Sequence, residues 1–443
     1  MMTKLANSRQ KFLFSLMIAS TLSFSAQALT PPTELIVKLK PNASVPFFGA
    51  QTHVQNLFGN VYIVRNKDLS LLENKLKKNK NVIYVERNNR SQKSPLPTLE
   101  STPQLLNKDL SASQFNDPSA NKVWAFSDAV KNGISVDAAY KIHGTSATET
   151  IIVAVVDTGI DKNHEDLKDV VWVNQNEIPD NGIDDDNNGY VDDVNGINTL
   201  VRDGQGRASG NNKDTHSHGT HVAGTIGAKQ NNSKGIAGIA SNVKIIGIRA
   251  VPNNSDETDI DIAESFIYAA KNGARIINCS FGKSSNEGRN LIPDTLKYIQ
   301  DKYGVLVIAA AGNSSDNIDR NPTYPASHLA ENLLIVASTT SSGGMSGFSN
   351  YGKNQVDVAA PGSSVYSTVP NNKYSSMSGT SMASPTTAGV AAEVLSQYPQ
   401  LSPIQLKNIL IESVTKVASF KDKMVSGGRI DLLKALELAR TIK

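Results

Sequence analysis

The sequence predicts an α/β fold, a doubly wound and mostly parallel sheet, preceded by a smaller α+β unit. The first observation is a series of short apolar runs after residue 150, at 151–156, 243–248, 274–279, 305–311 and 333–338. Continuous apolar strands are typical of a parallel sheet that is covered on both faces. The second observation is a helical stretch at 259–272, ended by Gly273, between two of these runs. In such sheets, ligands bind at the carboxyl ends of the strands.

A small α+β unit is predicted at residues 33–90. Segments 34–40 and 60–65 alternate in polarity like strands, and 82–85 supplies another. Between them, Asp68 can cap a helix with an apolar face made of Leu69, Leu72 and Leu76. Residues 91–115 are polar and interrupted by prolines, which is typical of a linker.

The first 28 residues predict an export signal. Lys4, Arg9 and Lys11 form a basic start, residues 12–24 are apolar, and Ala26-Gln27-Ala28 is a small-x-small cleavage site. The apolar run is much shorter than the roughly 20 residues that span a bilayer. We therefore expect a protein that is secreted, to the periplasm or the medium, after cleavage near Ala28 and that has no membrane anchor.

The composition excludes some classes of partner. The 443 residues carry 44 Lys and Arg against 41 Asp and Glu, a formal charge of +3 that gives no reason to expect a nucleic-acid partner. This charge is unevenly spread: residues 1–29 carry +3, residues 30–116 carry +6, and residues 117–443 carry −6. The single cysteine, Cys279, excludes an intrachain disulfide, and its apolar neighbours predict a buried thiol.

Three motifs place an Asp, a His and a Ser beside glycines in that order along the chain. Asp157 follows the first strand, His218 begins the sequence His-Gly-Thr-His-Val-Ala-Gly, and Ser381 lies in Gly-Thr-Ser-Met-Ala-Ser-Pro before a helix. A serine hydroxyl is a weak nucleophile at neutral pH and needs a neighbouring base, which in turn needs a carboxylate to fix its tautomer. Each motif alone is common in a turn or a helix cap, but together they predict a nucleophilic triad.

An amide side chain completes this set. The predicted strand 305–311 runs directly into Gly312 and Asn313. Acyl transfer develops negative charge on a carbonyl oxygen, and a fixed N–H donor at that point lowers the barrier. We expect Asn313 to supply one donor and the backbone nitrogen of Ser381 to supply a second.

These motifs resemble the subtilisin-like serine proteases (subtilases), in particular the thermitase-like and fervidolysin-like members. The resemblance covers a catalytic domain at 116–443. It implies a monomeric serine endopeptidase that hydrolyses protein and peptide substrates through an acyl-enzyme. It also implies that residues 29–115 are a propeptide that inhibits the enzyme and is cut by it within 89–116.

The resemblance also assigns a substrate-binding edge. Ser280, Phe281 and Gly282 resemble the segment that pairs with the substrate backbone, and residues 324–326 resemble a segment near the primary specificity pocket. Lys283 departs from the family pattern, because many relatives have glycine there, so the preferred substrate side chain is left open.

An acidic loop at 184–193 predicts a calcium site. Asp184, Asp186, Asn188, the Tyr190 carbonyl group and Asp192 supply oxygen ligands at alternate positions, with Gly189 at a sharp turn. No bidentate glutamate follows at the twelfth position, so we expect an irregular calcium loop rather than an EF-hand. The alternative is a solvated acidic loop without an ion.

The resemblance implies a second calcium site. Asp117, Asp166 and Asn232 match positions that bind calcium in thermitase-like members, with carbonyl groups of the 230–236 loop completing the shell. We expect calcium to be structural, and we expect no organic cofactor.

Two other classes of function remain as alternatives. His216, His218 and His221 have a spacing that also suits a zinc hydrolase, although threonine stands beside the last histidine where such sites usually have Asp. A calcium-dependent binding protein on an inactive protease fold is the non-enzymatic alternative. A fluorophosphonate probe separates them, because it labels only an activated serine.

Overall fold

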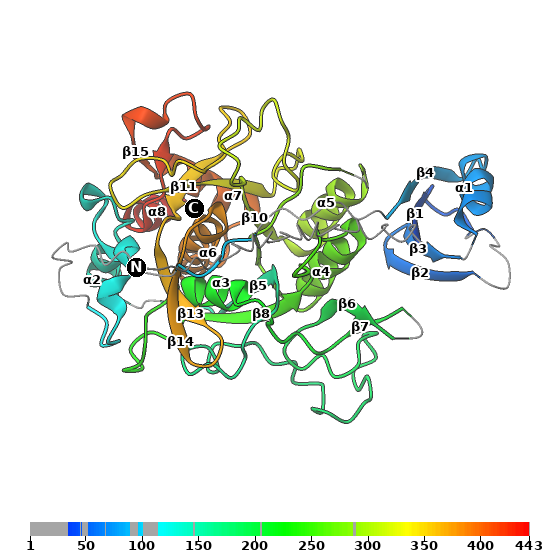
Figure 1. Ribbon diagram of the computed structural model, residues 1–443, viewed down its shortest axis with the longest axis horizontal. Coiled ribbons are helices and arrows are strands. Elements are labelled where there is room, and N and C mark those ends of the chain that lie inside the picture. The colour runs from blue at the N-terminus through cyan, green and yellow to red at the C-terminus, as the bar shows by residue number, and fades with distance from the viewer. Residues whose placement is uncertain are drawn as a thin grey trace, which may run out of the picture. The chain divides into compact units, whose positions relative to one another are not determined.

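Ten strands form one central sheet among the residues that the computed structural model describes (Figure 1). These residues are 34–44, 46, 52–66, 68–88, 96–100, 114–144, 147–203, 206–286 and 289–442. The predicted export signal at 1–28, with its cleavage site, and most of the predicted linker at 91–115 lie outside them. The strands, in order across the sheet, are β15 (Thr415–Lys416), β16 (Gly428–Arg429), β12 (Val358–Pro361), β11 (Leu333–Thr339), β10 (Leu306–Ala310), β9 (Ile276–Cys279), β5 (Ile151–Asp157), β8 (Val243–Arg249), β6 (Asn198–Arg202) and β7 (Ala208–Ser209).

The pairing confirms the predicted parallel sheet. Every neighbouring pair from β16 to β6 is parallel, and only the outermost strands, β15 and β7, pair antiparallel. All five predicted apolar runs are strands of this sheet, each buried along most of its length. The sequence analysis missed the shorter strands, because they are too short or too polar to show a pattern.

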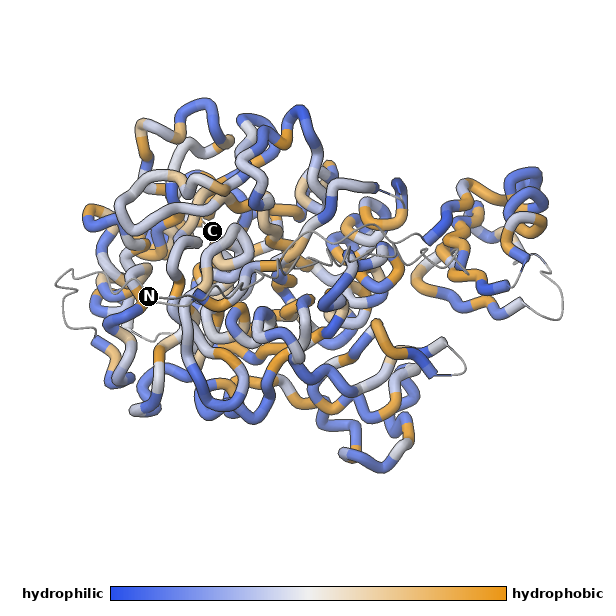
Figure 2. Tube along the Cα trace, in the orientation of Figure 1, coloured by the Kyte–Doolittle hydropathy of each residue, from blue (hydrophilic) through white to orange (hydrophobic). Residues whose placement is uncertain are grey.

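Helices cover both faces of the sheet, as a doubly wound fold requires. One hydrophobic core joins the sheet to α2 (Val136–His143), α3 (His218–Gly227), α6 (Thr380–Gln397), α7 (Pro403–Glu412) and α8 (Leu432–Ala439). A second core, on the opposite face, joins it to α4 (Asp259–Lys271) and α5 (Leu291–Tyr303). Figure 2 shows hydrophobic segments gathered in the central strands and helices, with hydrophilic residues along the surrounding loops.

Shorter elements complete the part of the chain that follows the small α+β unit. A hairpin of β13 (Val365–Val369) and β14 (Lys373–Met377) precedes α6. The 3-10 helices are η1 (Ala120–Lys122), η2 (Trp124–Phe126), η3 (Ala129–Lys131) and η4 (Ala418–Phe420). Over the described residues, no helix is both long enough and apolar enough to cross a membrane.

The strand of this sheet that comes first along the chain, β5, lies in the middle of the sheet. β5 pairs with β8 on one side and with β9 on the other, so the chain winds outward from β5 in both directions. The carboxyl ends of β5, β9 and β10 therefore lie at one edge of the sheet. Asp157, Ser280 and Asn313 lie at or just after these ends, which places the predicted catalytic and substrate-binding residues in one region.

Residues 34–88 form the predicted α+β unit. Its described strands pair antiparallel in the order β2 (His53–Phe58), β3 (Val61–Arg65), β1 (Glu34–Leu39) and β4 (Val82–Arg87). The helix α1 (Leu69–Lys77) is capped by Asp68, which accepts a hydrogen bond from the backbone nitrogen of Leu71. As predicted, the buried face of α1 consists of Leu69, Leu72 and Leu76, and it covers this small sheet.

This small unit contacts the amino-terminal half of α5. Residues from Pro32 onward form one compact unit. Lys38 Nζ lies 2.7 Å from a carboxylate oxygen of Asp294, and the Tyr84 hydroxyl donates to the same oxygen at 2.8 Å. Glu86 accepts a hydrogen bond from the backbone nitrogen of Asn290, the residue that precedes α5. A carboxylate at a helix N-terminus satisfies free N–H groups and complements the helix dipole.

Candidate active site

The end of β5 and the start of α3 bring Asp157 and His218 together. The Asp157 Oδ1 atom lies 2.7 Å from His218 Nδ1 and also accepts a hydrogen bond from the backbone nitrogen of Thr158. Both side chains are buried, with exposed fractions of 1% and 0%. A carboxylate at Nδ1 holds the proton on that nitrogen, so Nε2 is left as the basic atom.

The start of α3 is held in place by Asp214, which the sequence analysis missed. The Asp214 carboxylate accepts hydrogen bonds from the backbone nitrogens of His216, Ser217 and Thr220. It therefore satisfies backbone N–H groups at the start of the helix that carries His218. A Cβ atom on Gly219 would lie 2.0 Å from the carbonyl oxygen of Gly159, so only glycine lets α3 approach the end of β5 this closely.

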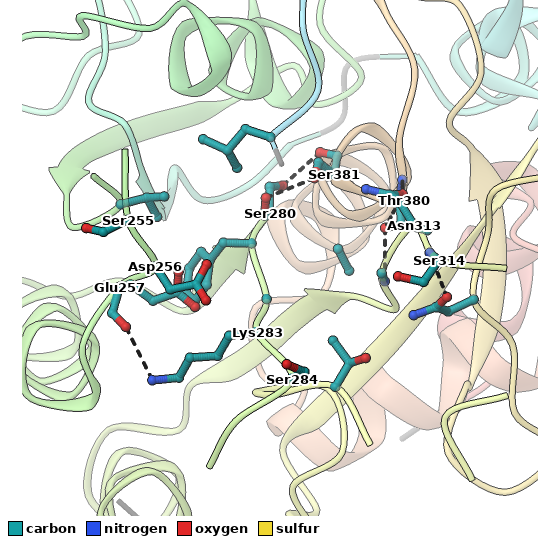
Figure 3. Close-up of a pocket in the computed structure, with 18 residues that line it drawn as sticks. Ser255, Asp256, Glu257, Ser280, Lys283, Ser284, Asn313, Ser314, Thr380 and Ser381 are labelled. Atoms are coloured by element: carbon teal, nitrogen blue, oxygen red, sulfur yellow. Dashed lines mark hydrogen bonds between the residues drawn. The ribbon is translucent and has the colours of Figure 1, made fainter. Parts of the chain in front are cut away.

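Ser381 is the second residue of α6 and faces the same region. Its side chain is 3% exposed, and its hydroxyl donates to the carbonyl oxygen of Ser280 at 2.9 Å (Figure 3). Among the described residues, the buried Nε2 atom of His218 has no hydrogen-bond partner. In the structure the Ser381 hydroxyl is thus bonded to Ser280 rather than to His218.

The side chain of Asn313 is oriented by Thr380. Its Oδ1 atom accepts hydrogen bonds from the Thr380 backbone nitrogen at 2.8 Å and hydroxyl at 3.0 Å (Figure 3). A Cβ atom on Gly379 would lie 3.5 Å from the Ser381 backbone nitrogen and 3.6 Å from Asn313 Nδ2. Both nitrogens therefore lie beside one point, which the Pro97 ring approaches at 2.7 Å. Two N–H donors close to one point are what an oxyanion hole requires.

A cavity of about 210 Å³ adjoins these groups (Figure 3). The predicted substrate-binding residues Ser280, Phe281 and Gly282 line it, together with Ser381 and Asn313. Ser280 is also tied to α6, because its hydroxyl donates to the Ser381 carbonyl oxygen at 2.8 Å. The backbone of Lys283, directly after these residues, pairs with Tyr324 in both directions, at 2.9 and 2.8 Å, which links the two segments that the resemblance assigned to substrate binding.

A short piece of the predicted linker, residues 96–100, lies against this cavity. Leu96 is one of its lining residues, and the Pro97 ring approaches the point beside Gly379 that faces both N–H donors. Glu100 donates from its backbone nitrogen to the Ser376 carbonyl oxygen at 3.0 Å and accepts from the Ser378 hydroxyl. The chain's own linker thus lies beside the predicted nucleophile.

The acidic loop contains a cluster that suits a cation. Ligand atoms of Glu177, Asp184 and Asp186 lie within 4.8 Å of one another. Burial raises the pKa of the Glu177 carboxyl, and the charges of Asp193 and Asp186 add to this shift, which backbone hydrogen bonds oppose. Within the described part of the chain, the buried Oε2 atom of Glu177 has no hydrogen-bond partner. Such hard oxygen donors fit calcium.

The structure places the other predicted ligands of this loop differently. The Asn188 side chain reaches Asp186 and Asp193 through its Nδ2 atom, at 3.1 Å to each. The Asp192 carboxylate instead accepts hydrogen bonds from the backbone nitrogens of Asn181 and Gly182. The structure therefore does not bring Asp192 into the cluster. Glu177 was missed because it precedes the acidic run, where no regular spacing marks it.

The second predicted calcium set lies together at the 230–236 loop. Asp117 accepts hydrogen bonds from the backbone nitrogens of Asn231 and Asn232, at 2.8 and 3.0 Å. Asp166 accepts the Asn232 side-chain nitrogen at 2.8 Å and the Ile236 backbone nitrogen at 2.9 Å. Burial raises the pKa of Asp117, and the nearby charge of Asp166 adds to this shift. Two neighbouring buried carboxylates are the kind of oxygen donors that calcium binds.

The zinc alternative finds no support in the described residues. The cluster around Glu177 is the only group there in which three His, Cys, Asp or Glu side chains offer closely spaced ligand atoms, and it contains no histidine. His221 is engaged elsewhere, with Nε2 2.9 Å from the Val365 carbonyl oxygen. Burial lowers its pKa to about 3 and keeps it neutral. Cys279 is buried as predicted, and burial raises its pKa well above the usual value.

Comparison with known proteins identifies the family. The model of the Peptidase S8 subtilase family matches residues 148–427. Subtilisin-like protease 1 of Plasmodium berghei (strain Anka) is 33% identical over 402 residues, covering 87% of this chain and 60% of the relative. Thermitase of Thermoactinomyces vulgaris is 36% identical over 290 residues, covering 64% of this chain and 88% of thermitase. The chain therefore belongs to the subtilase family.

A solved structure is similar as well. It is described as proteases from Pseudoalteromonas arctica PAMC 21717, and it matches with a TM-score of 0.56 at 27% identity, covering 74% of this chain and 100% of that one. The chain spans 60% and 43% of the length of two of its curated relatives, the subtilisin-like proteases 1 of Plasmodium berghei and of Plasmodium falciparum (isolate 3D7).

Proposed function

We propose that this protein is a secreted serine endopeptidase that hydrolyses peptide bonds through an acyl-enzyme. The observation that carries the proposal is the contact of 2.7 Å between Asp157 and His218, whose buried Nε2 atom has no hydrogen-bond partner among the described residues. Membership of the subtilase family supports the same reaction. A monomer is sufficient for it, because one chain supplies all four polar groups.

In the first step, His218 Nε2 accepts the proton of the Ser381 hydroxyl while Oγ forms a bond to the substrate carbonyl carbon. The oxyanion of this intermediate lies between the Ser381 backbone nitrogen and Asn313 Nδ2. His218 then donates its proton to the departing amine, and the C–N bond breaks to leave an ester on Ser381. Water attacks this ester by the reverse sequence of proton transfers, and Asp157 stabilises the imidazolium in each half.

The N-terminal unit would serve as a propeptide that holds the enzyme inactive. Its contacts with Asp294 and Asn290 join it to α5, and residues 96–100 lie against the predicted nucleophile. We propose that residues 29–115 remain bound after self-cleavage within 89–116. The signal at 1–28 would be removed on export.

Calcium would stabilise the folded enzyme rather than act in the reaction. Glu177, Asp184 and Asp186 would hold one ion, and Asp117, Asp166 and Asn232 would hold another with loop carbonyl groups. An ion bound only by the folded state raises its stability by mass action. It would also offset part of the net charge of −6 in residues 117–443.

Two measurements on purified protein test this function. A fluorophosphonate probe should label Ser381, and a casein or peptide substrate should be hydrolysed. The Ser381→Ala variant should show neither reaction and should remain uncut between residues 89 and 116. Hydrolysis without labelling would favour the zinc alternative, whereas calcium-dependent binding without either reaction would favour the inactive binding protein. Processing of the pure Ser381→Ala variant would contradict the proposal of self-cleavage, but not the proposed endopeptidase activity.

A further inference from the structure

The cavity beside Ser381 has a charged side. Figure 3 shows Asp256 and Glu257 across the cavity from Asn313, with Lys283 beneath them. All of these residues line the same cavity. Asp256 and Glu257 belong to the segment between β8 and α4, which is far in sequence from the segments that carry Asn313 and Ser381.

Glu257 is a buried carboxylate that lacks a partner on one oxygen. Its side chain is 3% exposed, and its Oε1 atom has no hydrogen-bond partner within the described residues. Burial raises its pKa to about 7, with the Lys283 charge opposing this shift and the charges of Asp256 and Asp259 adding to it. A buried polar atom without a partner costs free energy that a suitable donor recovers.

The neighbouring cation is engaged by another carboxylate. Lys283 is 3% exposed, and its Nζ atom lies 2.9 Å from an oxygen of Asp259. The same nitrogen donates at 3.2 Å to the backbone oxygen of Glu257 rather than to its free Oε1 atom. Among the described residues that line this cavity, the carboxyl groups of Asp256 and Glu257 therefore face one ammonium group, which Asp259 from outside the cavity lining already pairs.

We propose that Glu257 selects substrates that place a lysine or arginine side chain in this cavity, on the acyl side of the scissile bond. The inference rests on the proposed endopeptidase function and names its substrate class. A cationic side chain can donate a hydrogen bond to Glu257 Oε1, and its positive charge offsets the negative charge of the carboxylates. An apolar side chain leaves Oε1 unpaired. The chain's own Leu96, which lines the cavity, supplies neither. A basic substrate thus gains an interaction that the linker lacks.

Cleavage-site profiling of the mature enzyme on a peptide library tests the inference. Lysine and arginine should be enriched at one acyl-side position. Two peptides that differ there, lysine against norleucine, should then give a kcat/KM ratio that falls at least about tenfold in Glu257→Gln. Glu412→Gln, at a position on α7 away from the cleft, is the matched control and should keep the wild-type ratio.

A second measurement needs no variant. The lysine-to-norleucine ratio of the wild-type enzyme should rise with pH through about 7 as Glu257 ionises. The groups that face Glu257 are Lys283, Asp256, Asp259, His328 and Cys279. Any pH effect on the reaction steps that both peptides share cancels in the ratio.

The outcomes are distinct. Absence of lysine and arginine enrichment, a ratio that Glu257→Gln leaves unchanged, or a ratio independent of pH would each overturn the assignment of Glu257. Absence of all cleavage and of probe labelling would instead overturn the proposed endopeptidase function.

Discussion

The Thr380 hydroxyl donates a hydrogen bond of 3.0 Å to the side-chain oxygen of Asn313, and the Thr380 backbone nitrogen donates to the same atom. Because both donors hold Oδ1, the Nδ2 atom is turned toward the space beside the Ser381 backbone nitrogen. One residue thus orients the group that is proposed to stabilise the transition state, and it stands next to the nucleophile in sequence.

Replacing Asn313 tests the oxyanion hole. Asn313→Ala should lower kcat by about 10²–10³ with little change in KM, because the donor acts mainly on the charge that develops in the transition state. That magnitude is the one known for the equivalent donor of subtilisin, a relative. Steady-state kinetics on a short peptide will measure it. A rise in KM of the same size, with an unchanged kcat, would show instead that Asn313 binds the substrate in the ground state.

Replacing Thr380 tests how the amide is positioned. Thr380→Val keeps the shape and the backbone donor but loses the hydroxyl, which donates to Asn313 and accepts from the Gly312 backbone nitrogen. We expect kcat to fall about tenfold, because the Asn313 amide loses one of its two donors. Thr386→Val is the matched control, because its hydroxyl bonds only to carbonyl oxygens within and beside α6. It should lower the melting temperature without lowering kcat. Similar kinetics for both variants would contradict the positioning role.

Asp294 tests the contact between the N-terminal unit and α5. In the full chain, Asp294→Asn removes the negative charge that pairs with Lys38 and weakens the acceptor of Tyr84. The lag before activity appears should therefore shorten about threefold, as expected for a partly exposed ion pair. The effect should shrink in about 1 M salt, which screens charge. Asp301→Asn, on the same helix but paired with Lys297, is the control. A lag insensitive to salt would argue against charge attraction.

Chelation tests the calcium proposal. In a Ser381→Ala background, excess chelator should lower the melting temperature by several degrees, because calcium binds only the folded state. Glu177→Gln and Asp117→Asn should each remove part of this shift. Asp192→Asn should leave most of it, since that carboxylate holds backbone groups outside the cluster. A melting curve unchanged by chelator would contradict both proposed sites.

Glu257 also predicts a pH dependence of stability. Its pKa is raised from 4.5 to about 7 in the folded state, so between these values the folded protein binds more protons than the unfolded one. The free energy of unfolding should therefore fall as pH rises through this window, by on the order of 3 kcal/mol from this group. Denaturant unfolding of Ser381→Ala, with and without Glu257→Gln, will measure it. The protein that also carries Glu257→Gln should lose this pH-dependent part of the free energy of unfolding. Identical pH profiles for the two proteins would contradict the raised pKa of Glu257.

Much of the fold could be predicted because its central strands are continuous apolar runs. Segments such as 151–156 and 305–311 can be stable only where both faces are covered, which requires the layered architecture that the structure has. The short strands β7, β15 and β16 could not be predicted, because pairs of residues carry no periodicity and depend on their neighbours in the sheet.

The candidate site could be predicted where its polar residues stand at the end of a strand or at the start of a helix. Asp157 and Asn313 each follow a strand, and His218 and Ser381 each begin a helix, so a parallel sheet brings them to one edge. Glu177, Asp214 and Glu257 act through contacts that no local pattern encodes. Lys283 marks this limit most clearly, because its departure from the family pattern was visible but its buried partner, Asp259, lies 24 residues away.

The linker at 96–100 belongs to the same chain as the nucleophile that it lies against. Its concentration at the cleft is therefore set by the tether and does not fall when the protein is diluted, whereas a free inhibitor would dissociate. Before the chain is cut, such a block is as strong in a single molecule as in a concentrated solution. In the proposed zymogen, the same residues would become an ordinary ligand after the cut, and dilution alone would then release them from the cleft.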